Sequence, residues 1–421
     1  MAALLAGLLA GCTSTEPEGS DAQPITTGRP ALIDGFPPEG ELLGFERLAS
    51  LATPRAGTPA NPYNLALGED LLLASVGNPA GGLVPPMDLA VFDASDPAQA
   101  RLVSQVSLPG GGVESVAVTP DDAFGFLGTE FSGGVGIWVV DLTDPAQPVP
   151  VGYTPIATEG PHNIRYASFG GQEYLLASIS HVATPLALVG FPQDPLPVVD
   201  LRVDLFRFDR ASPETPMELV SSYQAVDPAG DERGVRLVHD AVHQTHPVTG
   251  QELMYVAHWD AGVRIVDITD PAAPQEIGVH ADPAPTDFLI IHTVKPHPGL
   301  LGGRHITVAT SQCAYAPDSP CHLRILDTTD PANITQIATW ELPDGTHGSG
   351  LTSEIFDLRD GLAVVPWGGA GTWALDITDP TAPVAFGYDR VPGFANAAAL
   401  KGDVAFVADA QGGLDVLRLP N

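Results

Sequence analysis

The chain has 421 residues, of which 51 are Asp or Glu and 18 are Lys or Arg, and its formal net charge at pH 7 is −33. This charge argues against nucleic acid and anionic lipid as partners, because both require a cationic protein surface. The length allows a large hydrophobic core, and a single repeat domain can include nearly all of it.

The first residues predict export. Residues 1–11 form an apolar run, MAALLAGLLAG, and Cys12 follows. The run is shorter than the roughly 20 residues that span a bilayer, and it is typical of the hydrophobic part of a secretory signal. Residues 9–12 resemble a bacterial lipobox, which implies that residues 1–12 are a lipoprotein signal and that Cys12 is lipidated. No Lys or Arg precedes the run, so a fortuitous apolar tail is the alternative.

The residues after Cys12 predict a tether. Thr13 follows the cysteine. By resemblance to Gram-negative lipoproteins it favours the outer membrane or cell surface, with membrane contact only through the lipid anchor. Residues 13–40 are rich in Pro, Gly, Ser, Thr and Glu, a composition typical of a flexible linker. Such a linker would hold a folded domain away from a membrane.

One unit recurs along the rest of the chain, and residues 255–278 are a complete copy. An apolar strand, a polar turn with Gly262, a second strand and the sequence Asp-Ile-Thr-Asp-Pro follow one another in this copy. The Asp that opens the last turn recurs at Asp93, Asp141, Asp209, Asp267, Asp327 and Asp376. A seventh half-copy, residues 407–420, ends the chain. Repeated units of this length with four strands each predict the blades of a β-propeller.

The Asp-x-Thr-Asp-Pro segments are interpreted as structural turns. Asp and Thr side chains accept hydrogen bonds from nearby backbone N–H groups, and Pro fixes the turn dihedral. The alternative, a calcium site, needs about six oxygen ligands, whereas each copy offers two carboxylates and then a Pro.

An N-terminal strand is expected to close the ring. Residues 41–51, ELLGFERLASL, resemble the fourth strand of the unit. The last blade lacks such a strand, and pairing the two removes the exposed sheet edges of an open array. The predicted fold class is therefore all-β, a seven-bladed β-propeller over residues 41–421. We expect it to be a monomer.

The repeated pattern resembles the LVIVD-repeat family. Its unit reads apolar-Asp-(Val/Ile)-(Ser/Thr)-Asp-Pro-x-x-Pro, and residues 263–274 and 372–383 match it closely. The resemblance covers residues 41–421 and implies a β-propeller, but it implies little about activity. More distantly, the arrangement is similar to the selenium-binding and methanethiol-oxidase propellers, which use histidines near the axis.

Two cysteines besides Cys12 are present, Cys313 and Cys321. In an exported protein this pair predicts a disulfide that closes one loop. A metal pair would need further Cys or His nearby, and only His322 is adjacent.

One face of the propeller is expected to carry function. The loops into the first strand of each blade and the loops between second and third strands share this face, and the Asp-Pro turns lie on the other. The irregular segments 77–87, 182–199 and 313–321 all belong to the first face. Loop variation on a rigid scaffold is where binding sites usually lie.

Histidines occur at this face. His162, His239 and His292 begin the innermost strands of three consecutive blades, and His347 lies near the equivalent place in the next. Imidazoles that meet at the axis could bind a transition metal such as Zn, Cu or Fe. The alternative is that each ring bonds to backbone or water in a wet channel.

Other residues are expected around the same axial mouth. They either occupy the corresponding first-strand positions of other blades or end second strands. The candidates for ligand binding, beside His162, are Asn64, Glu114, His181, His258, Trp259, Trp367 and Asn396. Glu130 ends a second strand as well.

Two functions follow as hypotheses. The leading one is a non-enzymatic exported lipoprotein that binds a protein or small ligand at the axial mouth. The alternative is a metal-dependent oxidoreductase or hydrolase that uses the axial histidines, with Glu114 or Glu130 as the acid or base. A nucleophile motif is poorly supported, since the His-Gly-Ser-Gly segment at His347 lacks a strand-turn-helix context.

Overall fold

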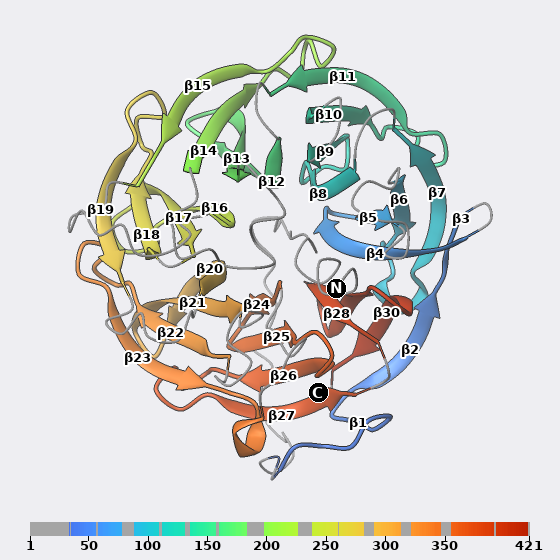
Figure 1. Cartoon of the computed structure of the whole chain (residues 1–421), viewed down its shortest axis with the longest axis vertical. Helices are drawn as coiled ribbons and strands as arrows, with labels where there is room; N and C mark the ends of the chain where they lie inside the picture. The colour runs from blue at the N-terminus through green and yellow to red at the C-terminus, as the bar shows by residue number, and fades with distance from the viewer. Residues whose placement is uncertain are drawn as a thin grey trace.

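The computed structural model describes residues 33, 35–55, 58–77, 88–108, 112–130, 135–156, 160–182, 198–225, 238–259, 261–281, 290–312, 321–346, 355–390 and 393–419. These residues form seven antiparallel sheets arranged around a ring, the blades of a β-propeller (Figure 1). The predicted all-β, seven-bladed fold is confirmed. Among the described residues, no helix has the length and apolar character to cross a membrane.

Strands that are consecutive in the chain run from the axis outward in each blade, except that two N-terminal strands complete blades 6 and 7. Blade 1 contains β3 (Thr53–Arg55), β4 (Thr58–Leu67), β5 (Leu71–Gly77), β6 (Asp88–Asp93) and β7 (Arg101–Ser107). Blade 2 contains β8 (Gly112–Val118), β9 (Phe124–Glu130), β10 (Gly136–Asp141) and β11 (Val149–Pro155). Blade 3 contains β12 (Pro161–Phe169), β13 (Gln172–Val182), β14 (Val198–Phe208) and β15 (Glu218–Tyr223). Blade 4 contains β16 (Asp240–Thr245), β17 (Glu252–His258), β18 (Gly262–Asp267) and β19 (Gln275–His280).

The remaining blades contain the end of the chain and its beginning. Blade 5 contains β20 (Ile290–Leu301), β21 (Arg304–Gln312), β22 (Leu323–Asp327) and β23 (Thr335–Trp340). Blade 6 contains β24 (Asp357–Arg359), β25 (Leu362–Pro366), β26 (Thr372–Asp376), β27 (Val384–Asp389) and the N-terminal β1 (Leu42–Leu43). Blade 7 contains β28 (Ala395–Lys401), β29 (Val404–Asp409), β30 (Gly413–Arg418) and the N-terminal β2 (Glu46–Leu51).

The ring closes through β2, as the sequence predicted. β2 pairs antiparallel with β30, from Glu46 opposite Arg418 to Leu51 opposite Leu414. The guanidinium of Arg418 lies 2.7 Å from the Glu46 carboxylate across this seam. Blade 7 therefore joins both ends of the folded chain, and the outer edge of β30 is covered by β2 rather than open.

The end of the predicted linker contacts blade 6. The Phe36 ring stacks on Trp373 with centroids 6.2 Å apart, and the Arg390 guanidinium lies 4.6 Å from the centroid of Phe36. The Gly40 N–H donates to the Arg390 carbonyl at 2.8 Å, and β1 follows. Residues 35–40 thus belong to the folded domain. The predicted signal, Cys12 and the linker up to residue 32 lie outside the described residues.

The hydrophobic core lies between neighbouring blades. Central strands are buried on both faces because each sheet is covered by the sheets on either side; in β18 only Asp267 is not fully buried. Outer strands such as β19 are half exposed. Each fully buried aliphatic side chain contributes about 1.5–3 kcal/mol to stability, so the interfaces between blades supply most of the folding energy.

The Asp-Pro segments are turns, as predicted. In every copy the first Asp accepts a hydrogen bond from the backbone N–H two residues on; at Asp267 the donor is Thr269 at 2.9 Å. The second Asp repeats the contact, as Asp270 does with Ala272 at 3.1 Å. The same hydrogen bond is accepted by the first Asp of the other copies, which are Asp93, Asp141, Asp209, Asp327 and Asp376. The carboxylates are thus used to hold the backbone.

The carbonyl group of the proline in this turn also contacts the outer strand of the preceding blade. A Cβ on Gly278, in the outer strand of blade 4, would lie 1.9 Å from the Pro331 carbonyl oxygen of blade 5. The Ser221 hydroxyl of blade 3 donates to the Pro271 carbonyl of blade 4 at 2.6 Å. The repeat therefore encodes both a turn and a contact point for its neighbour.

We expect Gly278→Ala to lower the free energy of unfolding by about 1–3 kcal/mol, because the added methyl group overlaps a backbone oxygen. Gly299→Ala is the matched control, since a Cβ there meets no atom within 4 Å, and it should change stability by less than about 0.5 kcal/mol. Urea unfolding followed by tryptophan fluorescence measures both. Equal stabilities of the two variants would show that the outer strand can shift freely.

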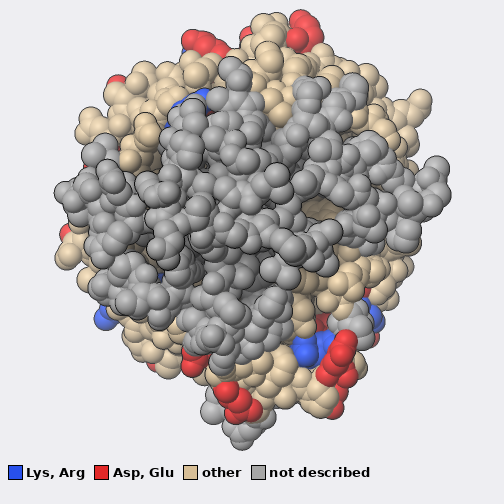
Figure 2. Space-filling view, viewed as in Figure 1, with Lys and Arg blue, Asp and Glu red and all other residues tan. Residues whose placement is uncertain are grey.

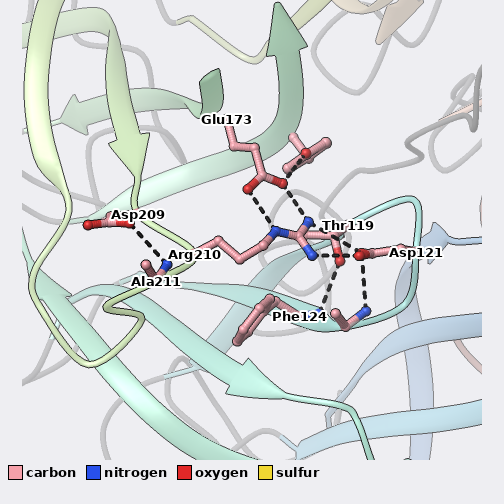
Figure 3. Close-up of polar contacts among 9 residues, drawn as sticks. Thr119, Asp121, Phe124, Glu173, Asp209, Arg210 and Ala211 are labelled. Carbon is pink, nitrogen blue, oxygen red and sulfur yellow. Dashed lines mark hydrogen bonds and ion pairs between the residues drawn. The ribbon is translucent and has the colours of Figure 1, made fainter. Parts of the chain in front are cut away.

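Charged side chains tie blades together. Figure 3 shows Arg210 of blade 3 between Glu173 of its own blade and Asp121 of blade 2. The guanidinium lies 2.6 Å from Glu173 and 2.5 Å from Asp121. Arg165 pairs with Asp240 between blades 3 and 4, and Lys295 pairs with Asp357 between blades 5 and 6. Several of the few cations of this acidic chain are therefore used inside the ring, whereas acidic side chains remain visible at its rim (Figure 2).

Candidate functional site

A β-bulge recurs at the same place in the innermost strands. In five blades the pairing between the first and second strands skips one residue. The skipped residues are Tyr63, Glu114, His162, His292 and Asn396. In blade 4, His239 takes this place directly before β16, and its N–H donates to the Ala257 carbonyl at 2.9 Å. A bulge redirects the unpaired side chain out of the regular alternation of the strand, so these residues form a ring around the axis.

Three of these positions bring histidines together. The Nε2 atoms of His162 and His239 are 3.0 Å apart, and their ring centroids are 4.5 Å apart. The rings of His239 and His292 lie closer still, with centroids 3.7 Å apart and a tilt of 40°. The three side chains are buried and come from β12, from the residue before β16 and from β20, which lie near the centre of Figure 1. We call them the axial histidine cluster.

Within the axial histidine cluster, His239 is neutral near pH 7. Burial lowers the pKa of His239 well below its usual value, and repulsion from His292 and His162 lowers it further. Neutral imidazoles each carry one N–H donor and one nitrogen lone pair. His239 is therefore an uncharged ring in a site from which water is largely excluded.

Buried polar contacts support these histidines. The Asn163 side-chain amide donates to the His239 carbonyl at 2.6 Å. Next to it, Arg165 donates two hydrogen bonds to Asp240, at 2.9 and 2.8 Å. These bonds fix the inner ends of β12 and β16 relative to each other. Sequence reasoning missed them, although a charged residue inside an otherwise apolar strand was a visible signal at Arg165.

A second group of buried polar atoms lies where blades 6 and 7 meet. Ala395 and Gly368 exchange backbone hydrogen bonds of 3.1 Å, so the backbones of Trp367 and Asn396 are neighbours. The Trp367 ring itself packs against Trp340 of blade 5, with ring centroids 5.3 Å apart. The side chains of Trp367 and Asn396 are both fully buried. Neither the Asn396 amide nor the Trp367 Nε1 atom has a hydrogen-bond partner in the part of the chain that the structure describes. Buried polar groups of this kind are normally satisfied by ordered water or by a ligand.

One predicted position is shifted by one residue. Asn64 is fully buried and pairs with Ser75 in the regular ladder of blade 1, and the bulge falls on Tyr63 instead. Asn64 therefore corresponds to Asn163 of blade 3, the residue after His162. No signal in the sequence marked a bulge at Tyr63, and ligand binding by Asn64 stays a prediction.

The other candidates lie around the axis or outside the described residues. His258 ends β17 and Trp259 follows it, and both are buried. The Trp259 carbonyl accepts from the Ile291 N–H at 3.0 Å, next to His292. The backbones of Glu114, Glu130 and His181 lie in β8, β9 and β13, but the structure does not describe their side chains. His347 and Cys313 lie outside the described residues. Cys321 is buried in the hydrophobic cluster between blades 5 and 6.

Metal ligation was also predicted for the histidines. Within the described ranges, no three His, Cys, Asp or Glu side chains are already arranged to hold a metal ion together. The structure brings His162, His239 and His292 into contact, and the Nε2 atoms of His162 and His239 face each other at 3.0 Å.

Comparison with protein families agrees with the repeat. The model of the LVIVD repeat matches residues 252–282 and 392–417. The chain carries LVIVD repeats. The first match covers β17 to β19 of blade 4, and the second covers the strands that the end of the chain contributes to blade 7. No curated protein matches the chain. The matched repeats and the seven sheets together show a propeller that carries LVIVD repeats. Neither of them shows its activity.

Proposed function

We propose that this LVIVD-repeat propeller is an exported lipoprotein that binds a protein or small ligand at its axial mouth. The observation that carries the proposal is the fully buried Asn396 amide, which has no hydrogen-bond partner among the residues that the structure describes. A fully buried amide cannot be reached by a flat protein surface. A small polar molecule is therefore favoured over a protein as the occupant.

The chemistry of the site indicates what such a molecule would carry. The Asn396 side chain offers both donors and an acceptor, and the Trp367 Nε1–H is a donor only. A ligand with a carboxylate or an amide group would hydrogen-bond to the Asn396 amide. An unpaired buried polar group costs about 1–3 kcal/mol, so such a ligand would gain affinity by removing that penalty.

A thermal-shift screen with small carboxylates, amides and amino acids tests the proposal. We expect at least one compound to raise the melting temperature of the wild type, and at 100 times its Kd the stabilisation is about 2.7 kcal/mol. Asn396→Leu should abolish the shift without loss of stability, because it removes an unpartnered amide at similar volume. Asn333→Leu, at an exposed turn of blade 5, should keep it. An equal shift in Asn396→Leu would contradict binding at the axis.

Export and lipidation remain part of the proposal. Residues 1–12 support a lipoprotein signal, and Cys12 would attach the protein to the outer membrane or cell surface through its lipid alone. Cys12→Ser is expected to move the protein from the membrane fraction to the soluble fraction and to prevent labelling with palmitate. A mature protein still labelled after this change would rule out Cys12 as the lipidated residue. Mass spectrometry without reduction would detect the proposed disulfide between Cys313 and Cys321.

A second candidate function is favoured by the contact between His162 and His239. A metal-dependent oxidoreductase or hydrolase would use these imidazoles as ligands and Glu114 or Glu130 as acid or base. Metal content after gentle purification, together with turnover that is lost when a histidine of the axial cluster is replaced, would favour this function over simple binding.

A further inference from the structure

We propose that Asn396 selects an uncharged ligand group that presents an N–H donor beside a C=O acceptor on one edge, as a primary carboxamide or a lactam does. This proposal rests on the proposed function, and it goes further because it excludes the carboxylates and peptide groups that a general polar site would accept. Three properties support it: both halves of the Asn396 amide are unpaired, the backbone of this residue is fixed, and the protein is strongly acidic.

The first property is that both polar atoms of the Asn396 side chain are unpaired. The side chain is fully buried, and neither Oδ1 nor Nδ2 has a hydrogen-bond partner among the residues that the structure describes. Oδ1 accepts hydrogen bonds and Nδ2 donates them, and the two atoms lie on one edge of the same planar group. A ligand that satisfies this edge therefore needs a donor and an acceptor of its own, side by side.

Few simple groups meet this requirement. A carboxylate has only acceptors, so it pairs with Nδ2 and leaves Oδ1 of Asn396 without a donor. An ammonium group has only donors and leaves Nδ2 without an acceptor. A trans peptide group carries a donor and an acceptor, but they point to opposite sides of the bond. A primary carboxamide or a lactam holds its N–H and C=O on one edge, and it can form two hydrogen bonds with Asn396 at once.

The second property is that the backbone of Asn396 is fixed on both sides. Its carbonyl accepts from the Ile355 N–H at 2.9 Å, and the Ile355 carbonyl accepts from the Ala398 N–H at 2.9 Å. Before it in the chain, Ala395 exchanges two hydrogen bonds with Gly368. Asn396 occupies the bulge of β28 between these contacts, and a bulge takes the side chain out of the regular alternation of the strand. A fixed attachment lowers the cost of ordering the amide around a ligand.

The third property is charge. The formal net charge of the chain is −33, and the field of such a protein repels an anionic ligand. Glu114 occupies the corresponding bulge of blade 2, so the ring of bulge positions itself contains an acidic residue. Burying a carboxylate without a cation costs far more than burying a neutral amide. We therefore expect a primary amide to bind at least tenfold more tightly than the carboxylate of the same shape, since one unpaired buried polar atom is alone worth about that factor.

Two matched series of compounds test the proposal on the full chain. The small series is acetamide, acetate and N-methylacetamide, and the large series is nicotinamide, nicotinate and N-methylnicotinamide, so that ligand size alone does not decide the result. Thermal shift identifies the series that binds, and isothermal titration calorimetry measures each Kd. The primary amide is expected to bind in at least one series, and its carboxylate and N-methyl analogues should bind at least tenfold more weakly.

Variants of Asn396 locate the binding site. Asn396→Leu removes the donor and the acceptor, and Asn396→Asp keeps the shape of the side chain but removes the Nδ2 donor. Each should weaken binding of the primary amide at least tenfold, whereas Asn333→Leu, at an exposed turn of blade 5, should leave it unchanged. Circular dichroism shows whether a loss reflects unfolding, and the use of two Asn396 variants guards against a failure of one of them to fold.

The failure of this inference differs from the failure of the proposed function. A carboxylate or N-methyl amide that binds as tightly as the primary amide, and through Asn396, would overturn the selectivity and leave the binding function standing. The same holds if neither series binds while another compound of the wider screen stabilises the wild type but not Asn396→Leu. Binding that survives in both Asn396 variants, or no stabilising compound in any screen, would refute both.

Discussion

Arg165→Met is expected to lower the free energy of unfolding by about 3–5 kcal/mol, the largest effect of any single replacement that the structure suggests. The guanidinium makes two hydrogen bonds to Asp240, at 2.9 and 2.8 Å, and both residues are buried. Removing the cation leaves the Asp240 carboxylate in the interior without its partner. Equilibrium unfolding in guanidinium chloride measures the loss.

Two control variants distinguish the effect of an unpaired buried carboxylate from the effect of lost packing. The double variant Arg165→Met with Asp240→Leu removes both charges, and it should recover most of the loss, because replacing a whole buried pair by apolar groups is often close to neutral. Arg210→Met breaks an ion pair whose side chains are 37% and 55% exposed, and it should cost less than about 1 kcal/mol from that pair. A double variant as unstable as Arg165→Met would show that packing, rather than the orphaned charge, causes the effect.

Acidification is expected to destabilise the protein through His305 by about 3 kcal/mol. Burial lowers the pKa of His305 to about 4, and repulsion from His246 adds to the shift. Its unfolded value is about 6.5, so the shift is worth roughly 3 kcal/mol at 1.36 kcal/mol per unit. Because the unfolded chain takes up the proton first, this stability is complete above pH 6.5. It is lost as the pH falls toward 4.

The hydrogen bonds explain why the neutral ring is preferred. His305 Nε2 donates to the Gln244 side-chain oxygen at 2.9 Å, and Nδ1 accepts from the Thr328 hydroxyl at 3.0 Å. Burial also lowers the pKa values of His246 and His297, which lie beside it. A proton on Nδ1 would break the hydrogen bond that this atom accepts from the Thr328 hydroxyl. The charged ring would also lie beside the imidazoles of His246 and His297.

Comparison of the wild type with His305→Gln isolates this group from the many carboxylates that titrate in the same range. The Gln side chain can keep the contact with Gln244 but carries no titratable nitrogen. We expect the stability advantage of the wild type over His305→Gln to fall by about 3 kcal/mol between pH 7.5 and pH 4. An advantage that stays constant over this range would disprove the assignment.

The fold could be predicted because each repeat carries its own turn chemistry. The Asp-x-Thr-Asp-Pro segments gave the number of blades, and the apolar pattern of residues 46–51 identified the closing strand. The attachment of β1 and Phe36 to blade 6 could not be seen in the same way. It depends on the contacts of Phe36 with Trp373 and Arg390, more than 330 residues later in the sequence, and no local pattern specifies such a pair.

The site could be predicted only in part, for a similar reason. His162, His239 and His292 occupy the same place in consecutive repeats, and closure of a ring brings such positions together. The bulge at Tyr63 adds one residue to the strand, and only the strand pairing reveals it. Counting along the sequence therefore placed Asn64, rather than Tyr63, at the position that corresponds to His162. The choice of Asp240 as the partner of Arg165 likewise depends on how neighbouring blades stack.

The two N-terminal strands have a mechanical consequence. A force applied to the chain before residue 35 reaches the aromatic contact of Phe36 with Trp373 first, and then the short pairing of β1 with β27. Only after both have been peeled away does the load reach β2, which holds the ends of the toroid together. The contacts with blade 6 therefore bear the force first, and the pairing of β2 with β30 in blade 7 can stay intact while the chain before residue 35 is pulled.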